Sequence, residues 1–172
     1  MTFTSFLKIT VLACAGSSTL LAALALAGSS ETGSAELIPA AAWWIIAAAA
    51  GAVIGRRNET SPAISRLLRD APTTGALPDT QPTRLVLNRL WPLAVLTIGA
   101  GAFVLVAPHV PAIAAGFPLI WALGWRHQPR AVQAIEDRDG VRFLIERTSP
   151  IKPIRLVRTP WFRAARGEPQ GS

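Results

Sequence analysis

Long stretches without a charged residue constrain this chain most. They are Ile9 to Ser30, Leu37 to Gly55, Leu90 to Pro108 and Val110 to Trp125. A helix at the surface of a soluble protein keeps a polar face toward water, whereas these stretches are rich in apolar residues on every face. Buried helices of a soluble protein are the alternative, but 16% charged residues leave too little polar sequence to cover four of them. The sequence therefore predicts an integral membrane protein.

We expect an all-α membrane protein in which four transmembrane helices form two antiparallel hairpins. The predicted helices cover residues 9–28, 38–55, 90–107 and 110–125. The first is about 30 Å long, which matches the hydrocarbon core of a bilayer. The last is only about 24 Å long and contains Pro118, so it has the weakest support. Before, between and after these helices lie residues 1–8, an outer loop over 29–37, a loop over 56–89, an outer turn at 108–109 and a tail over 126–172.

Lysine and arginine residues alternate between the two predicted sides of the membrane. One basic residue, Lys8, precedes the first predicted helix, six lie in the 56–89 loop, and ten follow Trp125. The 29–37 loop and the 108–109 turn contain none. Because basic loops stay in the cytoplasm, we expect a multi-pass protein with both termini cytoplasmic. Nearly all the basic residues are arginine, as in many GC-rich bacteria, so we expect the bacterial inner (plasma) membrane.

The first predicted helix has an alternative interpretation as a cleaved signal peptide. Lys8 is followed by an apolar run that ends in Ala25-Leu26-Ala27, a small-x-small cleavage pattern. Cleavage there would leave three membrane helices. The tail would lie on the same side of the membrane in either case.

The 56–89 loop is predicted to contain a short amphipathic helix over 62–70. Ser61-Pro62 reads as an N-cap followed by proline at the first helical position. The apolar face comprises Ile64, Leu67 and Leu68, and the opposite face carries Arg66 and Arg69. This pattern favours a helix that lies on the inner membrane surface. A proline-rich linker follows, and a helix is expected to restart at Thr83 and run into the third span.

The tail is predicted to contain a β-hairpin over 131–147. Ala131 to Glu136 and Val141 to Arg147 are the expected strands, and Asp137 to Gly140 is the expected turn. Because an isolated hairpin is only marginally stable in water, we expect it to pack against Ile154 to Val157, the membrane surface or a partner.

Small residues in the predicted spans indicate close contacts between helices. Gly51 and Gly55 form one small-xxx-small ridge, and Ala112 and Gly116 form another. Such ridges let two helix backbones approach each other, within one chain or across a homodimer. We favour contacts among the chain's own helices, because these motifs are common in alanine-rich spans.

No constellation of residues points to catalysis, a cofactor or a metal. The four predicted spans contain no Asp, Glu, Lys, Arg or His, whereas transporters and intramembrane enzymes usually need ionisable groups at depth. His109 and His127 are predicted to lie on opposite sides of the membrane, so they cannot share a metal. Glu136, Asp137 and Asp139 are interpreted as a solvated turn and not as a metal site.

We expect a non-enzymatic membrane scaffold or complex subunit whose basic tail docks lipid or protein. The loop and the tail carry net charges of +3 and +5, which draws both to anionic lipid of the inner leaflet. A partner is expected to read the segment Ile151 to Phe162. The candidate docking residues are Arg142, Phe143, Arg155, Trp161 and Phe162. Nucleic acid is not an expected partner, because acids and prolines interrupt the basic residues. The alternative is a small channel or transporter subunit that forms homo-oligomers through Gly51 and Gly55.

Overall fold

The computed structural model describes residues 1–29, 37–56, 59–74, 81–146 and 154–160. The chain is mostly helical, with one small antiparallel sheet. Its helices are α1 (Phe3–Ser29), α2 (Leu37–Ile54), α3 (Pro62–Arg69), α4 (Pro82–Ala102), the 3-10 helix η2 (Phe103–Leu105), α5 (His109–Trp125) and α6 (Gln128–Asp139). Its strands are β1 (Val141–Ile145) and β2 (Leu156–Pro160).

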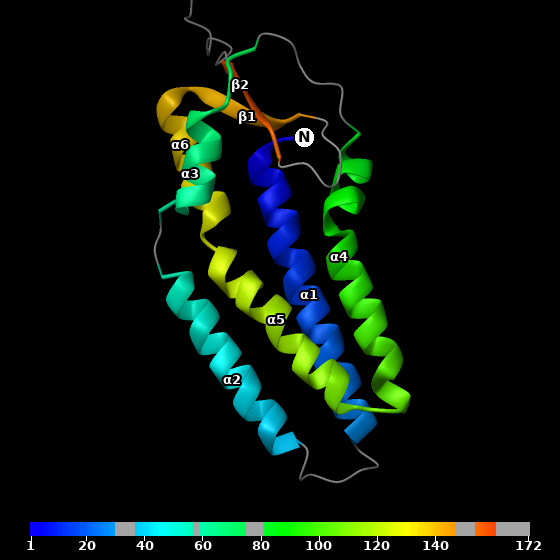
Figure 1. The fold of residues 1–172 in the computed structure, drawn as a ribbon. Coiled ribbons are helices and arrows are strands. Elements are labelled where there is room, and N and C mark those ends of the chain that lie inside the picture. The colour runs from blue at the N-terminus through cyan, green and yellow to red at the C-terminus, as the bar shows by residue number, and fades with distance from the viewer. Residues whose placement is uncertain (30–36, 57–58, 75–80, 147–153, 161–172) are drawn as a thin grey trace, which may run out of the picture.

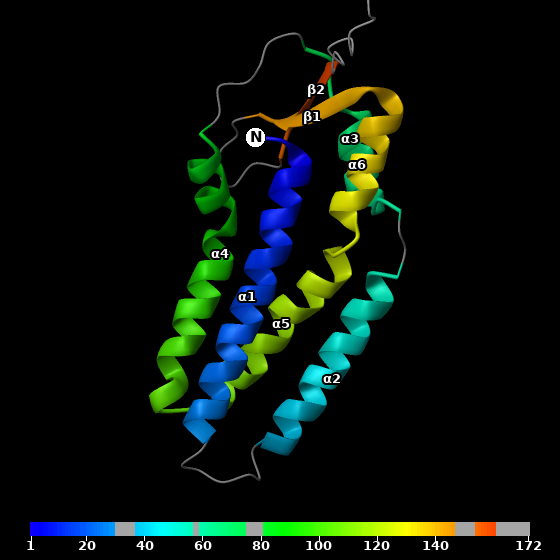
Figure 2. The same cartoon turned by 180° about the vertical axis from the view of Figure 1, so that it is seen from behind.

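Four of these helices, α1, α2, α4 and α5, form an elongated bundle, and the remaining elements gather at one of its ends (Figure 1). We call this end the head and define it as residues 1–7, 59–74, 128–145 and 154–160. α1 and α4 run away from the head, and α2 and α5 run back toward it. Seen from behind, α5 again lies between α1 and α2 (Figure 2). The helices alternate in direction as two antiparallel hairpins do, but α5 is the main neighbour of both α1 and α2.

α5 and α1 pack closely because small residues line their contact. Ala115 of α5 packs against Leu21 of α1, which is completely buried. The hydroxyl of Ser18 donates a hydrogen bond to the backbone oxygen of Ala115 (2.9 Å). The hydroxyls of Ser17 and Thr97 are hydrogen-bonded to each other and join α1 to α4. Polar side chains of this kind connect helices where water is excluded.

α2 is connected to α5 by two tryptophans. The indole N–H of Trp43 donates a hydrogen bond to the backbone oxygen of Ile113 (2.9 Å). The indole N–H of Trp44 donates to the backbone oxygen of Ala112 (2.7 Å). Each ring thus contributes apolar contact area and satisfies its single donor on the neighbouring helix.

Two helices are long and apolar enough to cross a membrane: α1, and α4 continued by η2 to Leu105. In the most apolar window of each, only 22% and 6% of the residues are buried. A core helix of a soluble protein is mostly covered, so this exposure is unusual for an apolar helix in water. α2, which is apolar over Ile38–Ile54, is shorter. The structure thus identifies two candidate membrane spans among the four that the sequence predicts.

The predicted hairpin over 131–147 is wrong in its first half. Residues 131–136 lie in α6 and not in a strand. β1 instead pairs antiparallel with β2, with Phe143 opposite Arg158. Gly140 ends α6 with φ 63°, the left-handed conformation of a glycine C-cap, so the Asp-Gly step terminates a helix and is not a hairpin turn.

The spacing of the buried residues explains why α6 is a helix. Pro129 lies in its first turn, where the fixed φ of proline suits a helix. Gln128, Val132 and Glu136 are buried and recur every four residues, which places them on one helical face. Residues 131–136 also contain strand-forming residues. The buried residues nevertheless follow the four-residue spacing of a helix and not the two-residue spacing of a strand.

α3 corresponds to the amphipathic helix predicted over 62–70. The Ser61 hydroxyl accepts a hydrogen bond from the backbone N–H of Ile64 (3.4 Å), and Pro62 begins the helix. Ile64 and Leu68 are buried among side chains of α1, α6 and the strands. The predicted position of this apolar face on the membrane surface is therefore wrong, because protein already covers it.

Candidate functional site at the head of the bundle

Separate parts of the chain meet in the sheet of the head. On the outer side of β1, the backbone N–H of Ile145 donates a hydrogen bond to the oxygen of Met1 (3.2 Å). On the outer side of β2, the N–H of Arg158 donates to the oxygen of Pro72 (2.9 Å). The oxygen of Arg158 accepts from the N–H of Thr74 (3.0 Å). The N-terminus, the loop between α2 and α4 and the tail therefore form one structural unit.

An apolar core shared by these segments holds the head together. Its buried residues are Phe3, Phe6, Leu7, Ile64, Leu68, Ala71, Val132, Phe143, Ile145 and Leu156. The side chains of Leu7, Val132, Phe143 and Ile145 are almost completely buried. Because α1 contributes three of these residues and then continues into the bundle, head and bundle share one packed helix.

Glu136 is a buried carboxylate within this core. Its Oε2 accepts a hydrogen bond from the hydroxyl of Thr4 (3.0 Å), and its Oε1 accepts from the backbone N–H of Phe143 (3.0 Å). The side chain thereby joins α6 to α1 and β1. The predicted position of Glu136 in a solvated turn is therefore wrong, whereas Asp137 and Asp139 are exposed.

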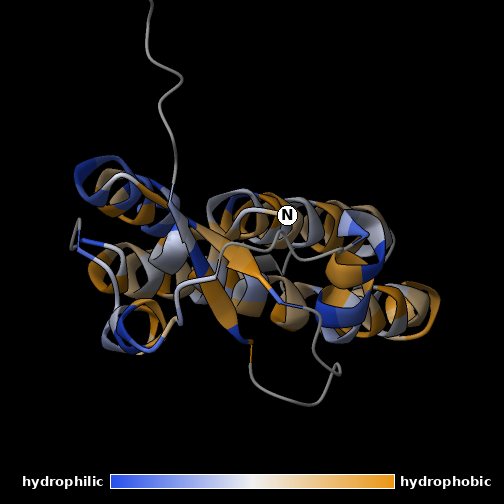
Figure 3. Ribbon diagram, turned by 90° about the horizontal axis from the view of Figure 1, so that it is seen from above, coloured by the Kyte–Doolittle hydropathy of each residue, from blue (hydrophilic) through white to orange (hydrophobic). Residues whose placement is uncertain are grey.

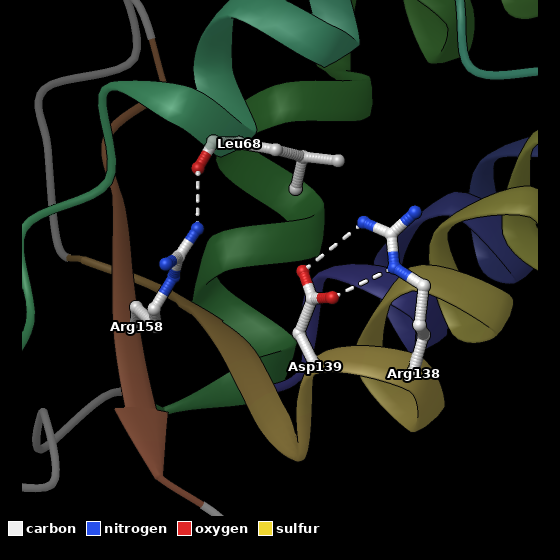
Figure 4. Close-up of polar contacts among 4 residues, drawn as sticks. All are labelled: Leu68, Arg138, Asp139 and Arg158. Atoms are coloured by element: carbon white, nitrogen blue, oxygen red, sulfur yellow. Dashed lines mark hydrogen bonds and ion pairs between the residues drawn. The ribbon is translucent and has the colours of Figure 1, made fainter.

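Arg158 lies between the sheet and α3 (Figure 4). Its Nη2 donates a hydrogen bond to the backbone oxygen of Leu68 (3.4 Å). Its guanidinium lies over the ring of Phe143, 5.5 Å from the ring centre. The Nε atom is buried and has no hydrogen-bond partner among the residues that the structure describes. The guanidinium is therefore held mainly by its aromatic contact and by one backbone oxygen.

The pair of Arg138 and Asp139 is solvent-exposed (Figure 4). Nε and Nη2 of Arg138 donate hydrogen bonds to the two carboxylate oxygens of Asp139 (2.8 and 3.4 Å). The hydrogen bond from Arg138 lowers the pKa of the Asp139 carboxyl group. Because water and salt screen such a pair, it contributes little to the stability of the head.

An open cavity of about 490 Å³ lies where the head meets the bundle. Ile54 at the end of α2, with Gly124 and Trp125 at the end of α5, forms its apolar side. Arg66 and Arg69 of α3 line it from the head. The remaining lining residues are Glu59, Thr60, Ser61, Pro62, Ser65 and Gln128. A concave site with apolar and charged sides can orient an amphipathic ligand.

Gln128 fixes the polar wall of this cavity. Its side chain is buried, its Oε1 accepts a hydrogen bond from the N–H of Ser61 (3.0 Å), and its Nε2 donates to the oxygen of Glu59 (3.2 Å). The segment before α3 is thus bound to the first residue of α6. Sequence reasoning missed Gln128 and the cavity, because both depend on segments that are far apart in the chain.

The predicted ridge of Gly51 and Gly55 lies against α5 of the same chain. A Cβ atom at Gly51 would come within 2.9 Å of the Leu123 Cβ atom and within 3.0 Å of the Ile120 oxygen. A Cβ atom at Gly55 would collide with the backbone oxygen of Leu123. The contact within the chain, which the sequence analysis favours over a homodimer, therefore occupies this ridge.

The second predicted ridge, Ala112 and Gly116, faces α2. A Cβ atom at Gly116 would collide with the indole ring of Trp43. Ala112 is buried, and its backbone oxygen accepts the hydrogen bond from Trp44. Each ridge thus packs against the other helix at a different level, Gly51 and Gly55 against residues 120–124 of α5, and Ala112 and Gly116 against Trp43 and Trp44 of α2.

The predicted docking residues differ in their surroundings. Phe143 is completely buried, so its predicted contact with a partner is wrong for the folded head. The reason is the alternation of β1, which directs Phe143 into the core and the neighbouring Arg142 outward. Arg155, which precedes β2, is also exposed. Trp161 and Phe162 lie outside the described residues.

Within the described ranges, no group of three or more His, Cys, Asp or Glu residues could hold a metal ion. His109 is exposed at the start of α5, at the end of the bundle away from the head. His127 precedes α6 and accepts a hydrogen bond from the Nε of Arg126 (2.9 Å).

No protein-family model, no curated protein and no solved structure matches this chain.

Proposed function

We propose that this chain is a non-enzymatic membrane subunit that docks a partner protein on a cytoplasmic head. In this proposal α1, α2, α4 and α5 cross the bacterial inner membrane, and both termini lie in the cytoplasm. The observation that supports it is the division of the molecule into an apolar bundle and a head assembled from distant, basic parts of the chain. In the view onto the head, hydrophilic segments surround a mostly hydrophobic strand (Figure 3).

Four crossings account for the lengths and surfaces of the shorter helices. α2 and α5 have 18 and 17 residues, which corresponds to about 27 and 26 Å of helix. These lengths approach the hydrocarbon thickness of a bilayer. Their exposed apolar side chains include Ile45, Ile46, Ile113, Phe117 and Trp121. Large apolar surfaces of this kind are rare on soluble monomers, and lipid would cover them.

Labelling of single cysteines tests the proposed topology. In a Cys14→Ser background, cysteine replaces either His109 at the far end of the bundle or Arg142 on the head. A membrane-impermeant maleimide added to intact spheroplasts is expected to label His109→Cys and to leave Arg142→Cys unlabelled until the membrane is opened. Equal labelling of both positions in intact spheroplasts would contradict the proposed topology.

The exposed arginines of the head are the proposed docking surface. Arg142 in β1 and Arg155 just before β2 are exposed, and their charge favours an acidic partner. Photoreactive residues at these two positions, activated in cells, are expected to capture one specific protein. The control is the same residue at Ile98, which is exposed on α4. Capture of lipid alone, or of the same products from Ile98, would rule out protein docking on this surface.

A channel or transporter subunit is the second candidate. The exposed apolar surface of α4 favours it, because a second copy of the chain could pack there. Gly51 and Gly55 are occupied by α5, so a homo-oligomer would use α4, where only 6% of the apolar window is buried. Cysteine at Ile98 in the Cys14→Ser background is expected to crosslink two copies if α4 forms the seam. Absence of both crosslinked oligomers and ion flux in proteoliposomes would exclude this candidate.

A further inference from the structure

We propose that the cavity between the head and the bundle binds the phosphate headgroup of an anionic phospholipid. The inference rests on the proposed insertion of the bundle into a membrane and assigns a specific ligand to one site of the protein. The cavity volume of about 490 Å³ is ample for a phosphate group with its glycerol linkage.

The position of the cavity corresponds to the depth of lipid headgroups. Ile54 is the last residue of α2, and Trp125 is the last residue of α5. Both line the cavity where the apolar helices end and the head begins. Tryptophan is enriched at this boundary, because its ring is apolar and its N–H is polar. A lipid beside α2 and α5 would therefore bring its phosphate to the opening of the cavity.

The head supplies positive charge that is not neutralised within the described chain. Arg66 and Arg69 are three residues apart on α3, so they project from the same side of the helix, and both line the cavity. Both are exposed, and neither guanidinium group forms an ion pair or a hydrogen bond with another described residue. The guanidinium fork matches the oxygens of a phosphate group, so two neighbouring arginines can bind one phosphate.

The two sides of the cavity together favour a lipid over a free phosphate ion. Ile54, Gly124 and Trp125 offer apolar contacts to the glycerol backbone and the upper acyl chains, which inorganic phosphate lacks. The hydroxyls of Thr60 and Ser65 are hydrogen-bonded to each other (2.7 Å) and add a polar surface to the cavity.

One acidic residue opposes the binding of an anion in this cavity. Glu59 lines the same wall and is exposed, so two arginines face one glutamate. The net charge of the residues that line the cavity is therefore positive. Removal of the negative charge of Glu59 should strengthen the binding of an anion.

Native mass spectrometry of the full-length protein in a neutral detergent tests the inference. Phosphatidylglycerol is expected to remain bound to the wild-type chain more strongly than phosphatidylcholine. The double variant Arg66→Gln with Arg69→Gln is expected to bind phosphatidylglycerol about tenfold more weakly or worse, because it loses charge-assisted hydrogen bonds. The matched control, Arg130→Gln with Arg138→Gln, removes the same charge from exposed positions of α6 that do not line the cavity and should bind like the wild type.

A gain of affinity separates this inference from loss of folding. Glu59→Gln is expected to bind phosphatidylglycerol more tightly, a result that misfolding cannot produce. Equal binding by the wild type and the Arg66/Arg69 variant, or equal binding of the two lipids, would overturn the proposal. Displacement of the lipid by equimolar inorganic phosphate would overturn the lipid assignment in favour of a free-phosphate site. Failure to capture a protein from Arg142 and Arg155 would refute docking and would leave the lipid site standing.

Discussion

Glu136 illustrates how much a single residue determines in the head. A buried carboxylate is costly unless hydrogen bonds satisfy it, and here a hydroxyl of α1 and a backbone N–H of β1 do so. The same two bonds specify how α6 lies relative to both elements. Gly140, four residues later, sets the angle between α6 and β1 through its positive φ. These two residues are thus the local determinants of the geometry of the head.

Glu136→Ala is expected to destabilise the head by about 2 to 4 kcal/mol, because two buried donors lose their acceptor. Hydrogen exchange followed by mass spectrometry should show lost protection in β1, and the thermal midpoint in detergent should fall. Glu136→Gln keeps one acceptor oxygen, so its thermal midpoint is expected to lie between those of the wild type and the Glu136→Ala variant. Asp137→Ala removes an exposed carboxylate from the same helix and should have little effect. Equal effects of the Asp137 and Glu136 changes would contradict this role.

Gly140→Ala is expected to cost about 1 to 2 kcal/mol, because the residue adopts φ 63°, which is unfavourable for a side chain with a Cβ atom. A Cβ atom there would meet nothing within 4 Å, so the cost is conformational and not steric. Gly140→Asn should cost less, since asparagine tolerates this conformation better. Thermal unfolding of the three proteins should give the highest midpoint for the wild type, a lower one for Gly140→Asn and the lowest for Gly140→Ala. An alanine variant as stable as the wild type would refute this prediction.

At the scale of the helices, glycine has two distinct roles in this bundle. At Gly51 and Gly55 its missing side chain lets α2 approach the backbone of α5. At Gly16 and Gly99 a Cβ atom would meet nothing within 4 Å. The contacts between α2 and α5 therefore depend on particular glycines, whereas other glycines of the bundle leave room for a side chain.

Gly51→Ala is expected to lower the thermal midpoint in detergent, because its Cβ atom would press on Leu123 and Ile120 and force α2 away from α5. Gly99→Ala is the matched control and should be neutral or stabilising by up to about 1 kcal/mol, the difference in helix propensity between the two residues. Intrinsic tryptophan fluorescence can monitor the unfolding of both variants, since Trp43 and Trp44 lie in the contact between α2 and α5. A Gly51→Ala variant as stable as the Gly99→Ala variant would show that α2 is not closely packed.

At the scale of the whole molecule, α1 connects the two parts of the protein. Phe3 and Phe6 lie in the core of the head, whereas Leu21 and Ala25 are buried in the bundle. Met1 also accepts a hydrogen bond from β1. Loss of this helix would remove part of both cores at once, which weighs against cleavage as a signal peptide.

We therefore expect the protein extracted from membranes to retain α1. A C-terminally tagged chain, purified and sequenced from its amino terminus, should not begin at Gly28 and should still contain the residues of α1 that precede it. A product that begins at Gly28 would identify α1 as a cleaved signal peptide and would require another arrangement of the head.

The sequence by itself determined where the helices of the bundle lie. Hydropathy is a property of each residue, so charge-free apolar stretches mark most of α1 and α4 and nearly all of α2 and α5 without knowledge of their neighbours. The start of α3 is also predictable from neighbouring residues alone, since the Ser61 hydroxyl accepts a hydrogen bond from a backbone N–H only three residues away. The alanine- and glycine-containing ridges also predicted which surfaces could approach closely.

Only the tertiary structure decided which segments form the head. The partner of β1 lies beyond a long connection, the first residues of the chain and Pro72 to Thr74 join the sheet edges, and Glu136 is buried. Residues 131–136 contain both helix-forming and strand-forming residues, so local propensity did not distinguish the two. Burial of Val132 and Glu136 on one face selected the helix, because that face packs against residues more than a hundred positions away.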